Sequence, residues 1–170
     1  TPSSSSAASD VYKRQFFMYD ILLKEIKLYL ETSSSFEESL KWICNLLKKR
    51  VEKYHWVGYY MNDEKNKRLV LKCFSGKPTS HKIIPYGKGV CGQVANKKKT
   101  IIVDDVESEE NYISCNIDVK SEIVVPLFLN NIIMGQIDID SNFPSAFNSH
   151  DELFLIEINS LVSKLLEENF

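Results

Sequence analysis

Cysteine is scarce in this sequence, and long apolar runs are absent. The chain has 170 residues, and its four cysteines stand at irregular spacing: Cys44, Cys73, Cys91 and Cys115. Such spacing is untypical of a disulfide framework. No apolar run approaches the roughly 20 residues of a membrane-spanning helix, and no signal peptide is visible. We therefore expect the protein in a reducing cytoplasm, with no membrane partner.

Neither sign of charge dominates the chain. Its 21 basic and 23 acidic residues give a formal net charge of -2, so it lacks the basic footprint of a nucleic-acid-binding protein. The basic run at 96–99 is typical of a solvated surface. Glycines at 87, 89 and 92 fit neither the GxxxxGK[ST] nor the GxGxxG spacing of phosphate-binding loops. We expect no cofactor and no nucleic-acid partner.

The composition changes abruptly at residue 16. Residues 1–15 are rich in serine and show no apolar periodicity, which predicts a disordered or non-native leader. The remaining residues, 16–170, have the length of one domain of ordinary size. We expect this domain to carry whatever function the protein has.

Helical and strand patterns follow one another along this domain. Helices are predicted over 16–30, after a capping box of Ser35 and Glu38, and after a second capping box of Ser149 and Glu152. Strands are predicted at 55–61, 67–74, 100–106, 121–129 and 132–140. This order predicts an α+β fold, in which a mainly antiparallel central sheet carries the N- and C-terminal helices on one face.

The predicted hairpin at 121–141 holds the most unusual side chains. Asp138 and Asp140 alternate with isoleucines, so both carboxylates point to the same face of the strand. Strands disfavour aspartate, and a buried carboxylate is costly unless it has a partner. That face is therefore either exposed to water or binds a cationic group.

Whether Glu122 joins the two aspartates depends on the hairpin register. A strict two-residue turn at 130–131 would pair Glu122 with Ile139 and face it away from them. A three-residue loop, or one bulge, would bring Glu122 onto the same face as Asp138 and Asp140. The sequence leaves both registers open.

Two cysteines and one tryptophan are further candidates. Cys91 stands near the start of a short predicted helix, where the helix dipole lowers a thiol pKa, so it is either a redox residue or a buried structural one. Cys115 lies in the polar loop 107–120, which leads directly into the hairpin. Trp56 is either part of the core or an apolar wall for a small ligand. Cys44 is expected to be a small buried apolar group.

The chain resembles GAF domains, and within them the free methionine-(R)-sulfoxide reductases. The motifs that carry the resemblance are GKGVCGQV at 87–94, the run from Cys115 to SEIVVP at 115–126, and GQIDIDS at 135–141, with weaker support from WVGYY at 56–60 and SGKP at 75–78. The resemblance implies a GAF-like single domain. It covers the chain from about residue 30 to its end.

The resemblance also implies roles for these residues. Cys115 would be the catalytic cysteine and Cys91 a second redox cysteine. Glu122, Asp138 and Asp140 would hold the substrate, with Trp56 as its apolar wall. Asp138 or Asp140 is also placed to donate the proton that the sulfoxide oxygen needs, since neighbouring carboxylates raise each other's pKa. Thioredoxin or another dithiol would regenerate the thiols.

Two departures from the family pattern bear on this interpretation. Ten positions before Cys91, where the family usually has a resolving cysteine, this chain has His81. The usual PGHIACD segment is ENYISCN here, at 110–116. These departures keep a second hypothesis open, a GAF module that senses a small amine or amino acid without turning it over. A homodimer formed through the terminal helices is a further expectation.

Overall fold

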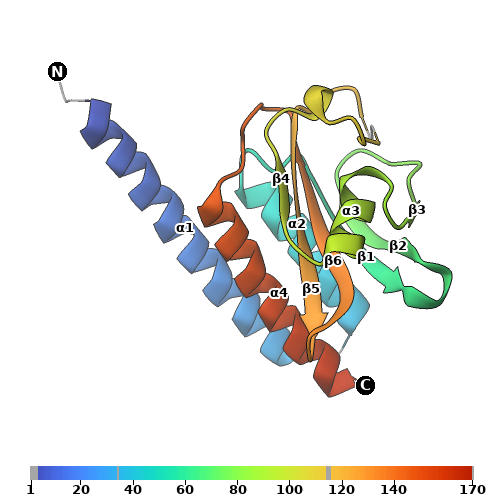
Figure 1. Ribbon diagram of the computed structural model, residues 1–170. Helices are drawn as coiled ribbons and strands as arrows, with labels where there is room; N and C mark the ends of the chain where they lie inside the picture. Colours follow the sequence, from blue (N-terminus) through green and yellow to red (C-terminus); the bar gives the residue numbers. More distant parts are fainter. Residues whose placement is uncertain (1–3, 34, 114–115, 170) are drawn as a thin grey trace.

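The computed structural model describes residues 4–33, 35–113 and 116–169 (Figure 1). Cys115, the predicted nucleophile, lies outside the described residues. The α-helices are α1 (Ser4–Thr32), α2 (Phe36–Arg50), α3 (Gly89–Lys97) and α4 (Ser149–Asn169). The strands are β1 (Trp56–Asp63), β2 (Arg68–Ser75), β3 (Ile83–Pro85), β4 (Ile101–Val103), β5 (Ser121–Leu129) and β6 (Ile132–Ser141). Two short 3-10 helices are η1 (Glu64–Asn66) and η2 (Val106–Ser108).

The six strands form one sheet in the order β3-β2-β1-β6-β5-β4. Every neighbouring pair in this sheet is antiparallel, which confirms the predicted α+β architecture. The sequence did not predict β3, which has three residues and pairs with the start of β2, at 68–70. Strands β1 and β6 occupy the middle of the sheet and β5 lies between β6 and the edge strand β4, so both strands of the predicted hairpin lie inside the sheet.

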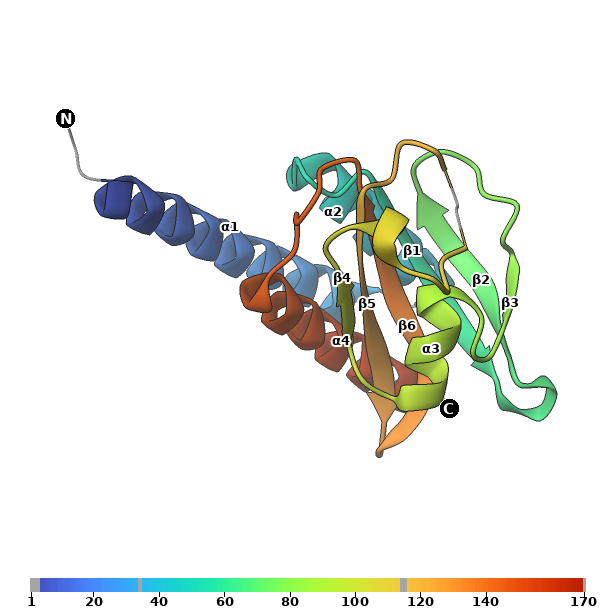
Figure 2. The same cartoon turned by 45° about the horizontal axis from the view of Figure 1, so that its top comes forward.

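Helices cover both faces of this sheet. Helices α2 and α4 pack on one face, and α1 runs beside α4 and also touches α2 (Figures 1 and 2). The small helix α3 covers part of the other face, as Figure 2 shows. Side chains of β1 alternate between the two faces of the sheet. Val57 and Tyr59 are buried toward the large helices, while Trp56 and Tyr60 are buried toward α3. The terminal helices therefore share one face, as predicted.

The β5–β6 hairpin combines a two-residue turn with a bulge. Asn130 and Asn131 both have positive φ, 49° and 65°, as a type I′ turn requires. The register then shifts by one residue between Leu127 and Phe128. Beyond this bulge Glu122 pairs with Asp140 rather than with Ile139. Of the two registers that the sequence left open, the structure has the one that places the three carboxylates on one face.

The two predicted capping boxes have different outcomes. Ser35 is the N-cap of α2 and accepts a hydrogen bond from the backbone N–H of Glu38 at 3.3 Å. The second prediction is wrong by one residue, because Asn148 rather than Ser149 caps α4. The Asn148 side chain accepts hydrogen bonds from the backbone N–H groups of His150 and Asp151 at 2.9 and 3.4 Å. Asparagine is as good an N-cap as serine.

Helix α1 begins before the domain boundary that the composition predicted. Residues 4–15 are the first part of the same helix, so the described part of the expected disordered leader is helical. Residues 7–14 are exposed, and Tyr19 is the first residue of α1 that is buried in the core. Whether residues 1–15 belong to the natural protein stays a prediction.

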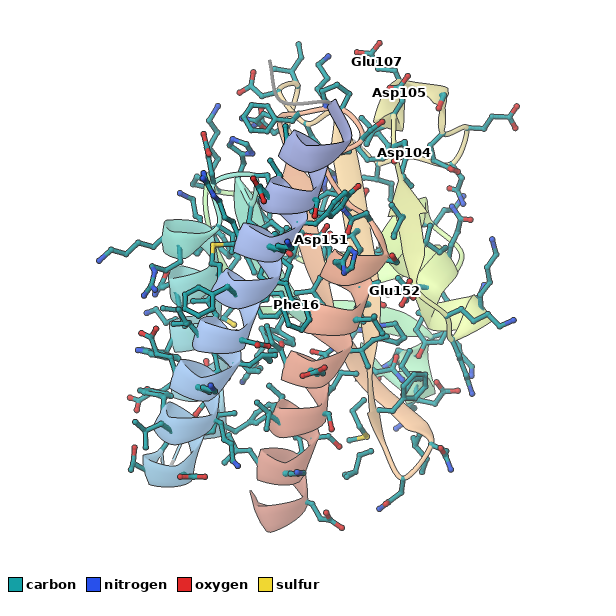
Figure 3. The ribbon with its side chains drawn as sticks, turned by 90° about the vertical axis from the view of Figure 1, so that its left-hand side faces the viewer. Phe16, Asp104, Asp105, Glu107, Asp151 and Glu152 are labelled. Atoms are coloured by element: carbon teal, nitrogen blue, oxygen red, sulfur yellow. The ribbon has the colours of Figure 1, made fainter. Side chains whose placement is uncertain are left out.

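A buried polar cluster joins α1 to the start of α4. Asp151 is fully buried and lies beside α1 (Figure 3). Its carboxylate accepts hydrogen bonds from the hydroxyls of Tyr19 and Tyr54, at 2.5 and 2.9 Å, and pairs with the Lys53 ammonium at 2.7 Å. Burial and this carboxylate raise the pKa of both tyrosines, so both hydroxyls stay protonated. None of the described helices combines the length and the apolar character needed to cross a membrane.

Candidate functional site

The α3 face of the sheet carries a cluster of three buried carboxylic acids. Glu122 comes from β5 and Asp138 and Asp140 from β6, and their exposed fractions are 5%, 2% and 2%. Their shared face follows from the bulge, because Glu122 pairs with Asp140 and Val124 with Asp138. The sequence therefore identified an unusual feature correctly, and the structure places it under α3 rather than in water.

Burial dominates the electrostatics of this cluster. It raises the pKa of Glu122 and of Asp140 well above the usual range, and the negative charge of Asp138 adds to both shifts. The pKa of Asp138 rises less, from 3.8 to about 6, because Cys91 and Glu122 hydrogen-bond to its carboxylate. Burial thus disfavours the ionised form of all three acids, and least so that of Asp138.

One carboxylate oxygen of Asp138 lacks a hydrogen-bond donor among the described residues. Within the described part of the chain, Oδ1 is buried and accepts no hydrogen bond. A buried carboxylate oxygen without a donor is unfavourable by about 1–3 kcal/mol or more. An incoming ammonium group would supply both the missing donors and the missing positive charge.

Cys91 lies directly against these carboxylates. It is in the first turn of α3, and its Sγ donates a hydrogen bond to Asp138 Oδ2 at 3.2 Å. Gln136 is fully buried on the same face of β6 and donates from Nε2 to the Cys91 carbonyl oxygen at 3.2 Å. Sequence reasoning missed Gln136, although it continues the alternation of 138 and 140. The lowered thiol pKa expected for Cys91 stays a prediction.

The loop that precedes Cys115 is attached to the start of α3. Asn111 accepts a hydrogen bond from the Gly89 N–H at 3.1 Å and donates one to the Gly87 carbonyl at 2.8 Å. Gly87 and Gly89 both have positive φ, 79° and 62°, a conformation that favours glycine. Asn111 belongs to the segment that departs from the family pattern. The altered segment therefore still anchors to the helix that carries Cys91.

Trp56 is both buried and part of a cavity wall, so the two interpretations that the sequence left open are compatible. It is 6% exposed, and its indole N–H donates to the Lys77 carbonyl at 3.1 Å. The ring stacks on Phe74 with centroids 5.7 Å apart. Two glycines make room for it, because a Cβ on Gly58 would overlap the indole and one on Gly76 would lie 2.6 Å from it. Sequence reasoning missed both roles, although Gly58 lies inside a strand, where a glycine is a signal of close packing.

A cavity of about 480 Å³ opens beside this wall. Its lining includes Trp56, Asp140, Lys77 and Asn116, the residue after Cys115. The volume is within the range of small-molecule sites. The other two carboxylates and Cys91 are not part of the lining, and Asp140 connects the cavity to them through its pairing with Glu122.

The same cluster has donor atoms for a metal ion. One ligand atom each from Cys91, Glu122 and Asp138 lie within 4.8 Å of one another. A thiolate with two carboxylates suits a borderline-soft divalent cation. The same atoms suit an ammonium group, which requires hydrogen-bond acceptors rather than a fixed coordination geometry.

Comparison with known proteins places this site in a family. A model of the GAF domain family matches residues 33–167. GAF domain-containing protein A of Dictyostelium discoideum is 37% identical over 144 residues, 85% of this chain and 89% of that protein. The free methionine-R-sulfoxide reductase of Saccharomyces cerevisiae is 34% identical over 155 residues, 84% of each chain. The X-ray structure of free methionine-R-sulfoxide reductase from Neisseria meningitidis in complex with its substrate has a TM-score of 0.85 at 33% identity, covering 90% of both chains.

The fold, the family model and these relatives agree. The chain belongs to the GAF domain family, and within it to the family of the free methionine-R-sulfoxide reductases. This confirms the resemblance drawn from the motifs around Cys91, Cys115 and Asp138. The enzyme class that the relatives define is an oxidoreductase that acts on a sulfur group.

Proposed function

We propose that this protein reduces free L-methionine-(R)-sulfoxide to methionine. The observation that carries the proposal is the buried group of Glu122, Asp138 and Asp140, in contact with Cys91 and next to the Trp56 wall. Relatives named as reductases of this substrate share the fold over most of the chain.

The carboxylate cluster accounts for the preference for a free amino acid. The ammonium of free methionine sulfoxide carries a positive charge that must be paired when it leaves water. The carboxylate of Asp138, with one oxygen lacking a donor in the described residues, supplies that pairing. The nitrogen of a peptide-bound methionine is an uncharged amide, so the same cluster would disfavour it. Trp56 would contact the apolar part of the side chain.

The chemistry is a two-electron transfer from a cysteine to the sulfoxide. Cys115, which lies outside the described residues, attacks the sulfoxide sulfur as a thiolate. The sulfoxide oxygen passes to the cysteine, which becomes a sulfenic acid, and methionine leaves in reduced form. Burial raises the pKa of Asp140 well above its usual range and so favours the protonated form, from which Asp140 would supply the proton that the oxygen needs.

Regeneration uses a second thiol. Cys91 attacks the sulfenic acid of Cys115, which forms a disulfide and releases water. A dithiol protein such as thioredoxin, in the reducing cytoplasm that the sequence predicts, then reduces the disulfide. His81 replaces the usual resolving cysteine, and its backbone carbonyl accepts a hydrogen bond from Tyr60 at 2.8 Å. Among the cysteines of the family motifs, Cys91 is therefore the resolving thiol that this chain offers.

Steady-state turnover tests the proposal. Free L-methionine-(R)-sulfoxide and its (S) form are supplied with either thioredoxin or a small dithiol, and methionine release is measured. We expect turnover of the (R) form alone, with loss of activity in Cys115→Ser and a preference for thioredoxin that Cys91→Ser abolishes. Full turnover by Cys115→Ser would refute the nucleophile.

A sensor of free amino acids is the second candidate, favoured by the altered loop 110–116 and by His81. It predicts binding of methionine or its sulfoxide without turnover by either reductant. Calorimetric titration of methionine sulfoxide into the protein separates the two. Binding that Asp138→Asn removes, in a protein with no turnover, would favour the sensor.

A homodimer through the terminal helices remains part of the proposal. On α1, Phe16, Phe17 and Leu28 are 62%, 68% and 67% exposed, and on α4 Leu153 is 59% exposed. Apolar side chains exposed on one helix pair favour self-association. Light scattering should give twice the monomer mass for the chain, and the monomer mass for Phe17→Glu. A monomer at high protein concentration would contradict the dimer.

A further inference from the structure

A second pair of thiols lies on the opposite face of the sheet from the candidate site. Cys44 is on α2 and Cys73 on β2, and their sulfur atoms are 3.8 Å apart. Cys44 is fully buried and Cys73 is half-buried. The proposed reductase chemistry uses neither of them.

Cys73 borders a cleft that reaches solvent. The cleft has a volume of about 390 Å³, and its lining includes Cys73 together with Lys41, Lys72, Lys82 and Glu37. Lys72 pairs with Glu37 at 2.7 Å, which leaves Lys41 and Lys82 as an excess of positive charge around the thiol. Such a surface attracts small anions. A small anionic reagent therefore has both space and charge in its favour at Cys73.

We propose that Cys73 and Cys44 form a second, reversible dithiol–disulfide site, which is oxidised by a small anionic disulfide that binds in this cleft. The Cys73 thiolate attacks one sulfur of the disulfide, which forms a mixed disulfide and expels one small thiolate. The Cys44 sulfur then attacks the Cys73 sulfur and expels the second small thiolate. The two protein thiols are oxidised, the small disulfide is reduced to two thiols, and the protein protons pass to those thiols.

The environments of the two sulfurs match these roles. A hydrogen bond from Cys44 lowers the pKa of the Cys73 thiol, whereas burial raises the pKa of the Cys44 thiol. The accessible sulfur is thus the better nucleophile, and the buried one acts only after it. A disulfide requires the sulfurs to approach to about 2.05 Å, a movement of less than about 2 Å from their present separation.

The crosslink would join the helix layer to the strand that supports the Trp56 wall. Phe74 follows Cys73 directly, pairs with Gly58 across β2 and β1, and stacks on the Trp56 ring. The oxidised form should therefore unfold at a higher temperature than the reduced form, since closing a loop restricts the unfolded chain. A dithiol should restore the lower transition.

A background without the other thiols isolates the pair. The chain has four cysteines, so the full chain with Cys91→Ser and Cys115→Ser contains only Cys44 and Cys73. Oxidised glutathione is the anionic probe and cystamine the cationic one. The reaction is followed by intact-protein mass spectrometry, with the disulfide mapped by non-reducing digestion.

We expect oxidised glutathione to give a Cys44–Cys73 disulfide with no retained glutathione. Adding Cys44→Ala should instead trap one glutathione on Cys73, and adding Cys73→Ser should abolish the reaction. Lys82→Gln should slow the reaction with glutathione disulfide severalfold and leave that with cystamine unchanged or faster.

Three outcomes would overturn the proposal. The first is retention of glutathione on Cys73 while Cys44 is present, because Cys44 would then fail to resolve it. The second is equal reaction of the Cys73→Ser and Cys44→Ala forms. The third is a faster reaction with cystamine than with glutathione disulfide. Circular dichroism of each variant ensures that the comparison is made on folded protein.

Discussion

We predict that the Asp138 carboxylate is needed to bind the substrate and lowers the stability of the ligand-free fold. The variant Asp138→Asn tests this. The structure buries this carboxylate and raises its pKa from 3.8 to about 6. At about 1.4 kcal/mol per pKa unit, the ionised group destabilises the ligand-free protein by about 3 kcal/mol above pH 6. Asparagine has nearly the same shape, and its carbonyl oxygen still accepts the hydrogen bond from Cys91.

The pH dependence gives the sign of this effect. Because the folded protein holds the Asp138 proton more tightly than the unfolded chain does, the wild type loses stability as the pH rises from about 4 to about 6. Asp138→Asn removes that loss. The variant should therefore exceed the wild type in free energy of unfolding at pH 8, by up to about 3 kcal/mol, and the difference should vanish near pH 4.

Urea denaturation at pH 4, 6 and 8 measures the free energy of unfolding of the wild type and of the variant. Asp104→Asn is the control at an exposed carboxylate (Figure 3). The same Asp138→Asn protein should lose binding of free methionine sulfoxide. A variant that is less stable than the wild type at pH 8, or a difference that does not change with pH, would refute the argument that this carboxylate is retained for its ligand.

Three further predictions follow from packing and backbone geometry. Gly58→Ala should destabilise the protein by about 1–3 kcal/mol and raise the KM for sulfoxide, since its Cβ overlaps the Trp56 indole; an equal loss in a Trp56→Phe background would contradict this. Asp151→Asn should cost at least about 2 kcal/mol in urea denaturation, because the amide removes the negative charge that pairs with Lys53 and keeps only one of the two acceptor oxygens that Lys53 and the two tyrosine hydroxyls share. An unchanged midpoint would disprove it. Asn131→Gly should raise the thermal midpoint and Asn131→Val should lower it, because the φ of 65° at this position favours glycine and disfavours valine. A higher midpoint for the valine variant than for the glycine variant would exclude the turn assignment.

Alternation along strands made much of the site predictable. The spacing of Asp138 and Asp140 requires a common face in any strand, whatever the tertiary structure. The position of Glu122 was undecided, because a single bulge changes the face of every residue beyond it. The bulge lies near Gly135, where a Cβ would overlap the Tyr60 carbonyl. That contact depends on β1, which is distant in sequence, so the hairpin alone could not reveal it.

Other features depend on contacts that no local pattern records. Strand β3 has three residues, and only its pairing with β2 defines it. The N-cap of α4 is Asn148 and not the predicted Ser149. Both residue types cap helices well, and the path of the backbone decides between them. Gln136 resembles any polar residue in a strand until Cys91 is placed against it. The pairing of Cys44 with Cys73 likewise requires the packing of α2 on β2.

A single-turnover measurement tests the central claim most directly. Fully reduced protein is mixed with excess free L-methionine-(R)-sulfoxide without any added reductant, and methionine and remaining thiols are counted together. The account predicts one methionine per chain, the loss of the Cys91 and Cys115 thiols, and no methionine from the (S) form. No methionine from either form, with all thiols intact, would contradict it.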